Sequence, residues 1–320
     1  MENTVAIRSR PMFTSWIRTK RLGWALAAGL CLAPAQNALA CAFHGYIPDP
    51  TLVDLLLATE QAVIARPTQR GTYQTIEALL GPNLRDIPVT PSAAFRGADT
   101  VLLLRDGAYG PWVEAAELDQ RFQSIIRAVI QNQSAWQLGQ DASRIQLFAS
   151  LVNDPNSSIQ RLALQELDRL PYATLKDVQV PPLRGLLENV EAGELDQRPI
   201  RILLAGLSDD RRFGPALANA LHAAVLQDKP YLGAYVTALI EQQGRPAVEE
   251  IIAQYLASGA TSPSVQAKLL DALALQYKTA RGGVRRTIAR EIAALVRDTP
   301  DMTELVVAQF GPQISGRILR

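Results

Sequence analysis

The sequence predicts an α+β chain in two parts, a small antiparallel β domain followed by an all-α domain of stacked helical pairs. Before residue 115, short apolar runs alternate with turn residues, which is typical of strands. After Asp141, apolar residues recur at helical spacing, and the runs end at Gly, Pro or Asn-Asp. A basic and then apolar N-terminus predicts that residues 1–40 are a cleaved signal peptide.

The N-terminal segment has the three regions of an export signal. Its first 21 residues hold five positive side chains and one acid, and residues 22–33 are uncharged and mostly apolar. That run is well short of the ~20 residues that span a bilayer. Ala38-Leu39-Ala40 is a small-x-small cleavage site, so we expect a cut after Ala40 and a periplasmic or secreted protein.

Cleavage there makes Cys41 the first residue of the mature chain and removes Cys31, so no internal disulfide can form. Lipoprotein signals also place a cysteine directly after the cut. Membrane association is therefore expected only if Cys41 is lipidated. The mature chain keeps 27 basic and 30 acidic residues, a net charge of −3, which disfavours nucleic-acid binding.

Residues 41–138 are predicted to form the β domain. A short helix is expected over 52–57, and Asp106-Gly107 is a strong turn signal between two strands. An amphipathic helix from Leu118 to Trp136 should cover the sheet, and Gly139 to Asp141 should form a hinge. The predicted strands are 61–65, 72–79, an edge strand at 86–90 that contains Pro88, 100–105 and a return strand from Gly110.

Residues 139–320 are predicted to be helical throughout, with no strand. Ser262-Pro263 and Thr299-Pro300 are helix starts with a capping side chain and a proline in the first turn. A Pro-Pro pair at 181–182 should open a short helix through Leu187. The remaining helices are expected around residues 145–152, 159–167, 195–207, 217–225, 232–240, 248–256, 265–273 and 284–296.

The helices repeat. Four segments align on their last core leucine, and these leucines are 40, 32 and 34 residues apart; they are Leu167, Leu207, Leu239 and Leu273. The small residues Ala163, Gly206, Ala238 and Ala272 lie where helices should approach closely. Residues 143–310 resemble the HEAT repeat family, which implies an α-solenoid in which neighbouring pairs bury each other's apolar faces. The unit between 171 and 208 departs most, and a single bundle without regular stacking is the alternative.

A second resemblance covers residues 41–105. A mature N-terminal Cys41, a short helix, Ala62-Val-Ile-Ala65 and the run from Tyr73 to Gly81 are similar to the netrin-like or tissue-metalloproteinase-inhibitor fold. That resemblance implies a five-stranded, OB-like barrel that inhibits a metalloprotease. Ala42-Phe43 replace the Cys-x-Cys usual there, and this departure puts the inhibitor function in doubt more than the barrel.

Few residues point to chemistry. The α-amine, the Cys41 thiolate and the His44 imidazole could bind a soft divalent metal or Cu(I), or they could anchor the terminus. His222 lies beside an apolar helical stripe and is expected to be structural. The chain has no Gly-rich phosphate loop, no Gly-x-Ser-x-Gly and no His-Glu-x-x-His. We therefore predict no catalytic residue, no cofactor and no enzyme activity.

One basic group remains on a predicted helix. Arg281, Arg285, Arg286 and Arg290 lie in line, where they could bind an acidic partner or lipid headgroups, or form a solvated face. Together with the predicted solenoid, this favours an exported binding or scaffold protein of the cell envelope with a protein partner. The alternatives are a barrel that acts as a metalloprotease inhibitor or metal binder through Cys41 and His44, and an enzyme with its site between the two parts.

Overall fold

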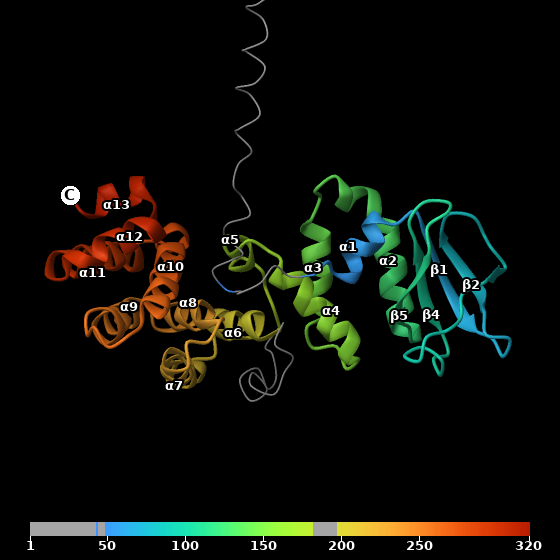
Figure 1. The fold of residues 1–320 in the computed structure, drawn as a ribbon, viewed down its shortest axis with the longest axis horizontal. Helices are drawn as coiled ribbons and strands as arrows, with labels where there is room; N and C mark the ends of the chain where they lie inside the picture. Colours follow the sequence, from blue (N-terminus) through green and yellow to red (C-terminus); the bar gives the residue numbers. More distant parts are fainter. Residues whose placement is uncertain (1–42, 44–48, 182–196) are drawn as a thin grey trace, which may run out of the picture. The chain divides into compact units, whose positions relative to one another are not determined.

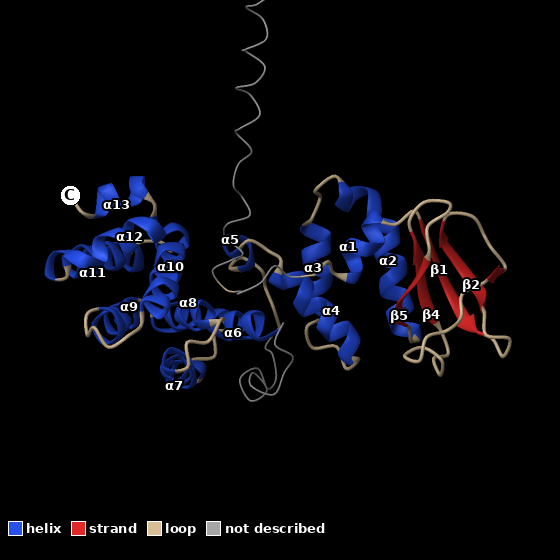
Figure 2. Cartoon of the chain, viewed as in Figure 1, coloured by secondary structure: helices blue, strands red, loops and turns tan. Residues whose placement is uncertain are grey.

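The computed structural model describes residues 43, 49–181 and 197–320, and its elements are drawn in Figures 1 and 2. The first element, helix α1 (Leu52–Ala58), begins at Thr51, whose side chain accepts from the Asp54 backbone while the Asp54 side chain accepts from the Thr51 N–H. This reciprocal capping box satisfies two backbone donors and explains why the predicted helix begins where it does.

A curled antiparallel sheet of five strands follows, in the order β3-β2-β1-β4-β5. The strands are β1 (Gln61–Pro67), β2 (Tyr73–Leu80), β3 (Asp86–Ile87), β4 (Val101–Arg105) and β5 (Trp112–Glu117). The predicted strands are confirmed, except that the edge strand expected over 86–90 is only the two residues of β3 and ends before Pro88, whose missing N–H cannot join the ladder. Strand β5 is the other edge, so the hydrogen-bonded order of the described strands is open and not a closed barrel.

The apolar runs of the central strands β1 and β4 are buried on both faces of the sheet, which accounts for their lack of polar alternation. Ala62 and Ile64 of β1 face the core shared with the helices, whereas Val63 and Ala65 belong to a smaller core on the opposite face. That smaller core is completed by Tyr73, Ile87, Ala98, Val101 and Leu103, with Val89, Phe95 and Trp112 packed against it. The loop after β3 therefore covers the face of the sheet that the helices leave free.

Helix α2 (Gln120–Gln137) covers the other face and is capped by Asp119, whose carboxylate accepts from the Phe122 N–H at 2.6 Å. Its apolar side faces Leu102 and Leu104 of β4 in the main core. At its end the backbone turns at Gly139, where φ is +79°, and α3 begins three residues later. Residues 39–320 form one compact unit. Its main hydrophobic core contains side chains from the predicted β domain and from the predicted helical domain.

The rest of the described chain is helical and contains no strand. The helices are α3 (Ala142–Leu151), α4 (Ser157–Asp168), α5 (Tyr172–Leu175), α6 (Arg198–Leu207), α7 (Phe213–Leu226), α8 (Leu232–Gln243), α9 (Arg245–Ile251), a π-helical turn η3 (Ile252–Leu256), α10 (Pro263–Thr279), α11 (Gly283–Asp298), a 3-10 turn η4 (Pro300–Met302), α12 (Thr303–Phe310) and α13 (Pro312–Ile318). The predicted helices in the described ranges are confirmed. The helix expected from 181–182 to Leu187 lies outside the described residues, apart from Pro181 itself.

The helices contact one another in chain order. In what we call the first row, α4 packs on α6, α6 on α8, α8 on α10 and α10 on α12. In the second row, α9 packs on α11 and α11 on α13. The rows are joined by α8 with α9, α10 with α11 and α12 with α13, while α7 packs against α6 and α8.

Helix α8 shows how completely such contacts enclose a helix. All nine residues from Leu232 to Ile240 are buried, so α8 is apolar on every side, as expected for a helix with neighbours all round. Gly206 of α6 is where α6 and α8 come closest, because a Cβ on it would lie 2.6 Å from the Cβ of Ala238. The predicted role of small residues at the helix contact is confirmed for this pair.

Candidate functional site

The predicted metal ligands Cys41 and His44 lie outside the described residues. Phe43, between them, is described: it is buried, and its ring lies 5.6 Å from that of Tyr172 in an edge-on arrangement. Tyr172 belongs to α5, so Phe43 packs against the helical region. In the described ranges, no group of three or more His, Cys, Asp or Glu is placed to hold a metal ion.

His222 lies on α7 with its side chain exposed. Its Nδ1 lies 3.3 Å from the hydroxyl of Tyr255, which belongs to the π-helical turn η3. Burial, with a smaller effect from the charge of Glu250, raises the pKa of Tyr255, so its hydroxyl stays neutral. The pair links α7 to η3, as expected for a structural histidine.

The four predicted arginines do not act as one group. Arg290 is neutralised, since its Nη2 lies 2.7 Å from carboxylate oxygens of both Glu249 and Glu291. Arg285 is exposed and lies over the ring of Tyr277, with its Cζ 4.9 Å from the ring centroid. Arg281 and Arg286 are exposed and form no ion pair with any described residue.

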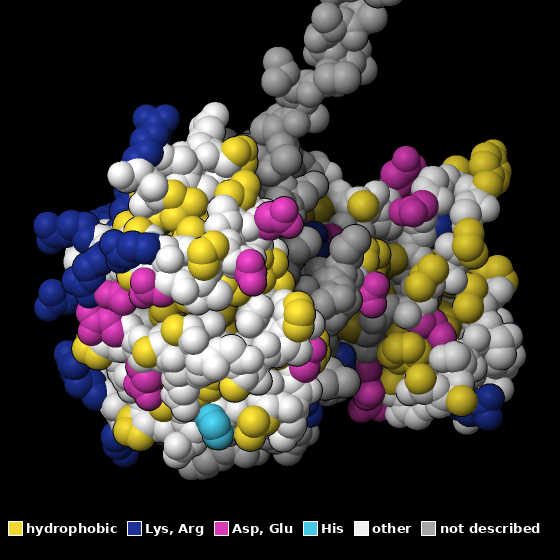
Figure 3. Space-filling model, turned by 60° about the vertical axis from the view of Figure 1, so that its left-hand side comes forward, with side chains coloured by type: hydrophobic (Ala, Val, Ile, Leu, Met, Phe, Trp, Pro, Cys, Tyr) yellow, Lys and Arg dark blue, Asp and Glu magenta, His cyan; other side chains and the backbone are white. Residues whose placement is uncertain are grey.

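A fifth arginine joins the uncompensated three. Arg245 begins α9, and its side chain runs along the start of α11, where a Cβ on Gly283 would lie 3.2 Å from Arg245 Cδ. We call Arg245, Arg281, Arg285 and Arg286 the arginine face. Figure 3 shows Lys and Arg side chains gathered along one edge of the helical region, with Asp and Glu side chains beside them.

The start of α11 does nothing to offset this charge. Its N-cap is Gly282, without a side-chain cap, and its first turn holds no acidic residue. Because a helix N-terminus carries partial positive charge, basic side chains there are unfavourable for the helix. The sequence missed Arg245, although Gly244-Arg245-Pro246 is itself a helix-start signal, because its closeness to Gly283 depends on the packing of α9 on α11.

A second group of charges joins α1 to the first helices of the helical region. Glu166 of α4 is buried and accepts from the Thr51 hydroxyl at 2.5 Å and from Arg144 Nε at 2.6 Å. Asp54 accepts from Arg144 Nη2 at 3.1 Å and from Arg169 Nη1 at 2.8 Å. We call these five residues the junction cluster; its two carboxylates and two guanidiniums balance in charge.

The four charged members of the junction cluster line a cavity of about 230 Å³, together with Phe148, Leu167 and Pro171 among others. Burial by itself would raise the pKa of Asp54, but the Thr51 N–H, Arg144 and the charge of Arg169 together lower it. Burial would likewise lower the pKa of Arg144, but its bond to Glu166 raises it. Asp54 and Arg144 therefore hold their ordinary charges. Every charged group of the cluster is engaged with another, as in a structural anchor.

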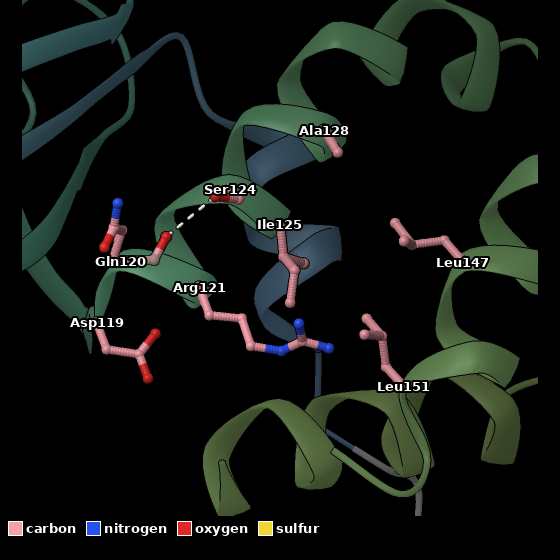
Figure 4. A pocket seen from close by; sticks show the side chains of 8 residues that line it. All are labelled: Asp119, Gln120, Arg121, Ser124, Ile125, Ala128, Leu147 and Leu151. Atoms are coloured by element: carbon pink, nitrogen blue, oxygen red, sulfur yellow. Dashed lines mark hydrogen bonds between the residues drawn. The ribbon is translucent and has the colours of Figure 1, made fainter. Parts of the chain in front are cut away.

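A larger cavity of about 690 Å³ lies between α2 and α3 (Figure 4). In Figure 4, Leu147 and Leu151 of α3 point toward Ile125 and Ala128 of α2, so most of the lining is apolar. Gln120 and Ser124 line the part near the start of α2, where the Ser124 hydroxyl donates to the Gln120 carbonyl at 3.0 Å.

The charged groups of this cavity are already engaged. Arg121 Nε donates to Asp154 at 2.6 Å, and the Asp154 carboxylate is fully buried. Asp119 accepts from the Phe122 N–H, which does most to lower the pKa of Asp119, and from Asn156 Nδ2 at 2.6 Å. Arg121 and Asp119 therefore fasten α2 to the loop between α3 and α4.

Comparison with protein-family models, with curated proteins and with solved structures finds no match to this chain. No helix in the described part of the chain is long and apolar enough to cross a bilayer.

Proposed function

We propose that this chain is an exported binding or scaffold protein of the cell envelope, and that its helices from α3 onward form a HEAT-like solenoid that binds another protein. The observation that carries the proposal is the chain-order packing of two rows of helices. In a solenoid each pair contacts only its neighbours, and the stack offers a long surface to a partner. The step from stack to binding protein is an argument from fold analogy.

The arginine face is the surface that we expect to meet the partner. Its four arginines are exposed, lie at the start of α9 and at or just before the start of α11, and form no ion pair with a described carboxylate. The start of α11 itself adds positive charge. A folded chain with no use for such a cluster would gain by placing acids there. We therefore infer that the partner presents an acidic protein segment, which guanidinium groups bind through charge-assisted hydrogen bonds.

Export is part of the proposal and rests on the sequence alone. The order of a basic segment, an apolar run and Ala38-Leu39-Ala40 supports cleavage before Cys41. Intact-mass measurement of the protein recovered from the envelope tests it. A mass starting at Cys41 supports export, and additional lipid mass identifies a lipoprotein; a mass that includes residues 1–40 contradicts the proposal.

Capture from an envelope extract tests the binding function. The full chain should retain a specific protein at low salt. It should release that protein as the salt concentration rises, because exposed charges are screened beyond about 8 Å near physiological ionic strength. Arg245→Glu with Arg286→Glu should abolish capture. The matched control, Arg70→Glu with Arg96→Glu, reverses two exposed arginines of the β part and should capture normally. Equal capture by both variants would show that the arginine face has no role.

A further inference from the structure

Residues 171–178 depart from the two-row arrangement. A regular unit would hold a second helix beside α7 between α4 and α6; in the described part of that stretch, up to residue 181, the chain forms the single turn α5. In Figure 1, α5 lies above α6 and α8, whereas α7 lies below them. The side chains of Tyr172 and of the C-cap Lys176 make hydrogen bonds with α8 and α10, so the segment lies across the first row.

These contacts converge on one carboxylate oxygen, Glu241 Oε1 of α8. The Tyr172 hydroxyl donates to it at 2.8 Å, Lys176 Nζ at 2.7 Å and Gln276 Nε2 of α10 at 3.0 Å. Tyr172 and Lys176 are four residues apart, so one helical turn brings both to Glu241. Glu241 therefore holds the segment through a tyrosine and a lysine that lie on the same side of a single helical turn.

The same two side chains also contact each other through a cation–π interaction. Tyr172 is 3 % exposed, and the Lys176 ammonium lies 5.6 Å from the centroid of its ring. Leu175, on the turn between them, is 2 % exposed. Burial, reinforced by the charge of Glu241, raises the pKa of Tyr172 well above its ordinary value, so the hydroxyl remains a hydrogen-bond donor.

The face of α8 and α10 that contacts α5 offers more hydrogen-bonding groups than α5 uses. Gln276 is fully buried, and its Oε1 has no hydrogen-bond partner although its Nε2 bonds both Tyr172 and Glu241. Thr237, one turn before Glu241 on α8, is also fully buried with an unpartnered hydroxyl. Since buried polar groups are nearly always paired, two such groups on one face suit a ligand that supplies more partners than α5 does.

We propose that the face of α8 and α10 around Glu241 is a recognition site for a segment of another protein with tyrosine and lysine four residues apart on one helical turn. Residues 171–178 occupy this site within the chain and compete with that segment. The inference rests on the proposed binding function and names the chemistry of a partner segment. A segment tethered this closely acts at a local concentration in the millimolar range, so the site should be largely closed until a stronger ligand enters.

The test uses a fluorescent peptide with the sequence of residues 170–181, measured by anisotropy with the full chain. Wild type should bind it weakly, because α5 holds the site. Lys176→Glu should bind it at least about tenfold more tightly, because a glutamate beside Glu241 expels the chain's own segment while Tyr172 is retained. Adding Glu241→Gln should remove that gain, and the control Lys278→Glu, on the exposed side of α10, should behave as wild type. Equal binding by Lys176→Glu and wild type overturns the proposal.

Native-state hydrogen exchange decides the matter if Lys176→Glu does not fold. The amides of Leu175 and Lys176 donate to the carbonyls of Pro171 and Tyr172. If α5 can leave the site, these amides should exchange at least about tenfold faster than those of α8. Exchange only together with α8 would show that α5 is a permanent part of the core and would overturn the proposal. The capture assay with the arginine face is independent of either result.

Discussion

Gly206 and Ala238 bring α6 and α8 together so closely that no side chain fits between them. A methyl group on Gly206 would lie 2.3 Å from the Ala238 Cα and 2.9 Å from its carbonyl oxygen, both backbone atoms that cannot move aside alone. Gly206 lies in the last turn of α6, one residue before its end at Leu207, and glycine in a helix is less favourable than alanine. Close packing of the first row therefore outweighs helix propensity at this position.

Gly206→Ala should consequently destabilise the protein, although alanine favours helices. Overpacking of a tight contact costs about 1–3 kcal/mol of unfolding free energy, measured here by urea denaturation. The control is Gly316→Ala on α13, where a Cβ would meet nothing within 4 Å and the residue is exposed. That change should leave stability equal or raise it by about 0.4–1 kcal/mol. Equal effects at both positions would mean that α6 and α8 do not meet at Gly206.

The junction cluster predicts a larger effect. Arg144→Ala removes a charged donor from Glu166, whose side chain is 3 % exposed, and leaves that carboxylate buried with the Thr51 hydroxyl as its main partner. Breaking a buried ion pair from one side costs about 3–5 kcal/mol. Arg212→Ala, which breaks the exposed pair with Asp210, should leave the urea midpoint unchanged. Arg144→Met combined with Glu166→Met should recover part of the loss, and its failure to do so would point to a role of Arg144 beyond this pair.

The same cluster predicts a loss of stability in acid. The folded state lowers the pKa of Asp54 below its ordinary value of 3.8, so the unfolded chain binds the proton first as pH falls. Stability from this carboxylate is therefore complete above that value and disappears as pH falls through the lower, folded pKa. Urea midpoints of wild type and Asp54→Asn should converge as pH falls below about 4. Asp106→Asn, at an exposed turn, serves as the control. If the urea midpoints of wild type and Asp54→Asn stay equally far apart as pH falls, the lowered pKa of Asp54 is contradicted.

Local signals predicted most of the elements. Asp106-Gly107 and Ser262-Pro263 fix a hairpin turn and a helix start through contacts within a few residues, and the structure confirms both. Gly206 and Ala238 were predictable as a close approach because small residues recurred at aligned positions. Elements and their contacts therefore follow from periodicity and from capping chemistry, both of which are visible in the sequence.

The functional contacts were not visible in this way. Glu166 pairs with Thr51, 115 residues away, and Tyr172 with Glu241, 69 residues away, so nothing in the local pattern separates these side chains from solvated ones. The turn α5 is too short for a helical period, and the π-helical turn at Ile252–Leu256 inserts a register change into a run that reads as ordinary helix. Arg290 was grouped with its neighbours by spacing, but Glu249 of α9 neutralises it across a helix contact.

The arginine face finally predicts opposite effects on stability and on binding. Arg286 lies in the first turn of α11, where its charge opposes the helix dipole, so Arg286→Glu should raise the unfolding free energy by about 0.3–1 kcal/mol while weakening capture of the partner. Arg297→Glu, in the last turn of the same helix, is the matched control. A positive charge near a helix C-terminus interacts favourably with the helix dipole, so losing Arg297 should lower stability and leave capture unchanged. Thermal unfolding of both variants beside wild type, with capture from the same extract, measures the two effects together. Protein surfaces used for binding commonly sacrifice stability in this way. A destabilised Arg286→Glu variant would show instead that the arginine stabilises α11, and the argument that its placement serves a partner would fail.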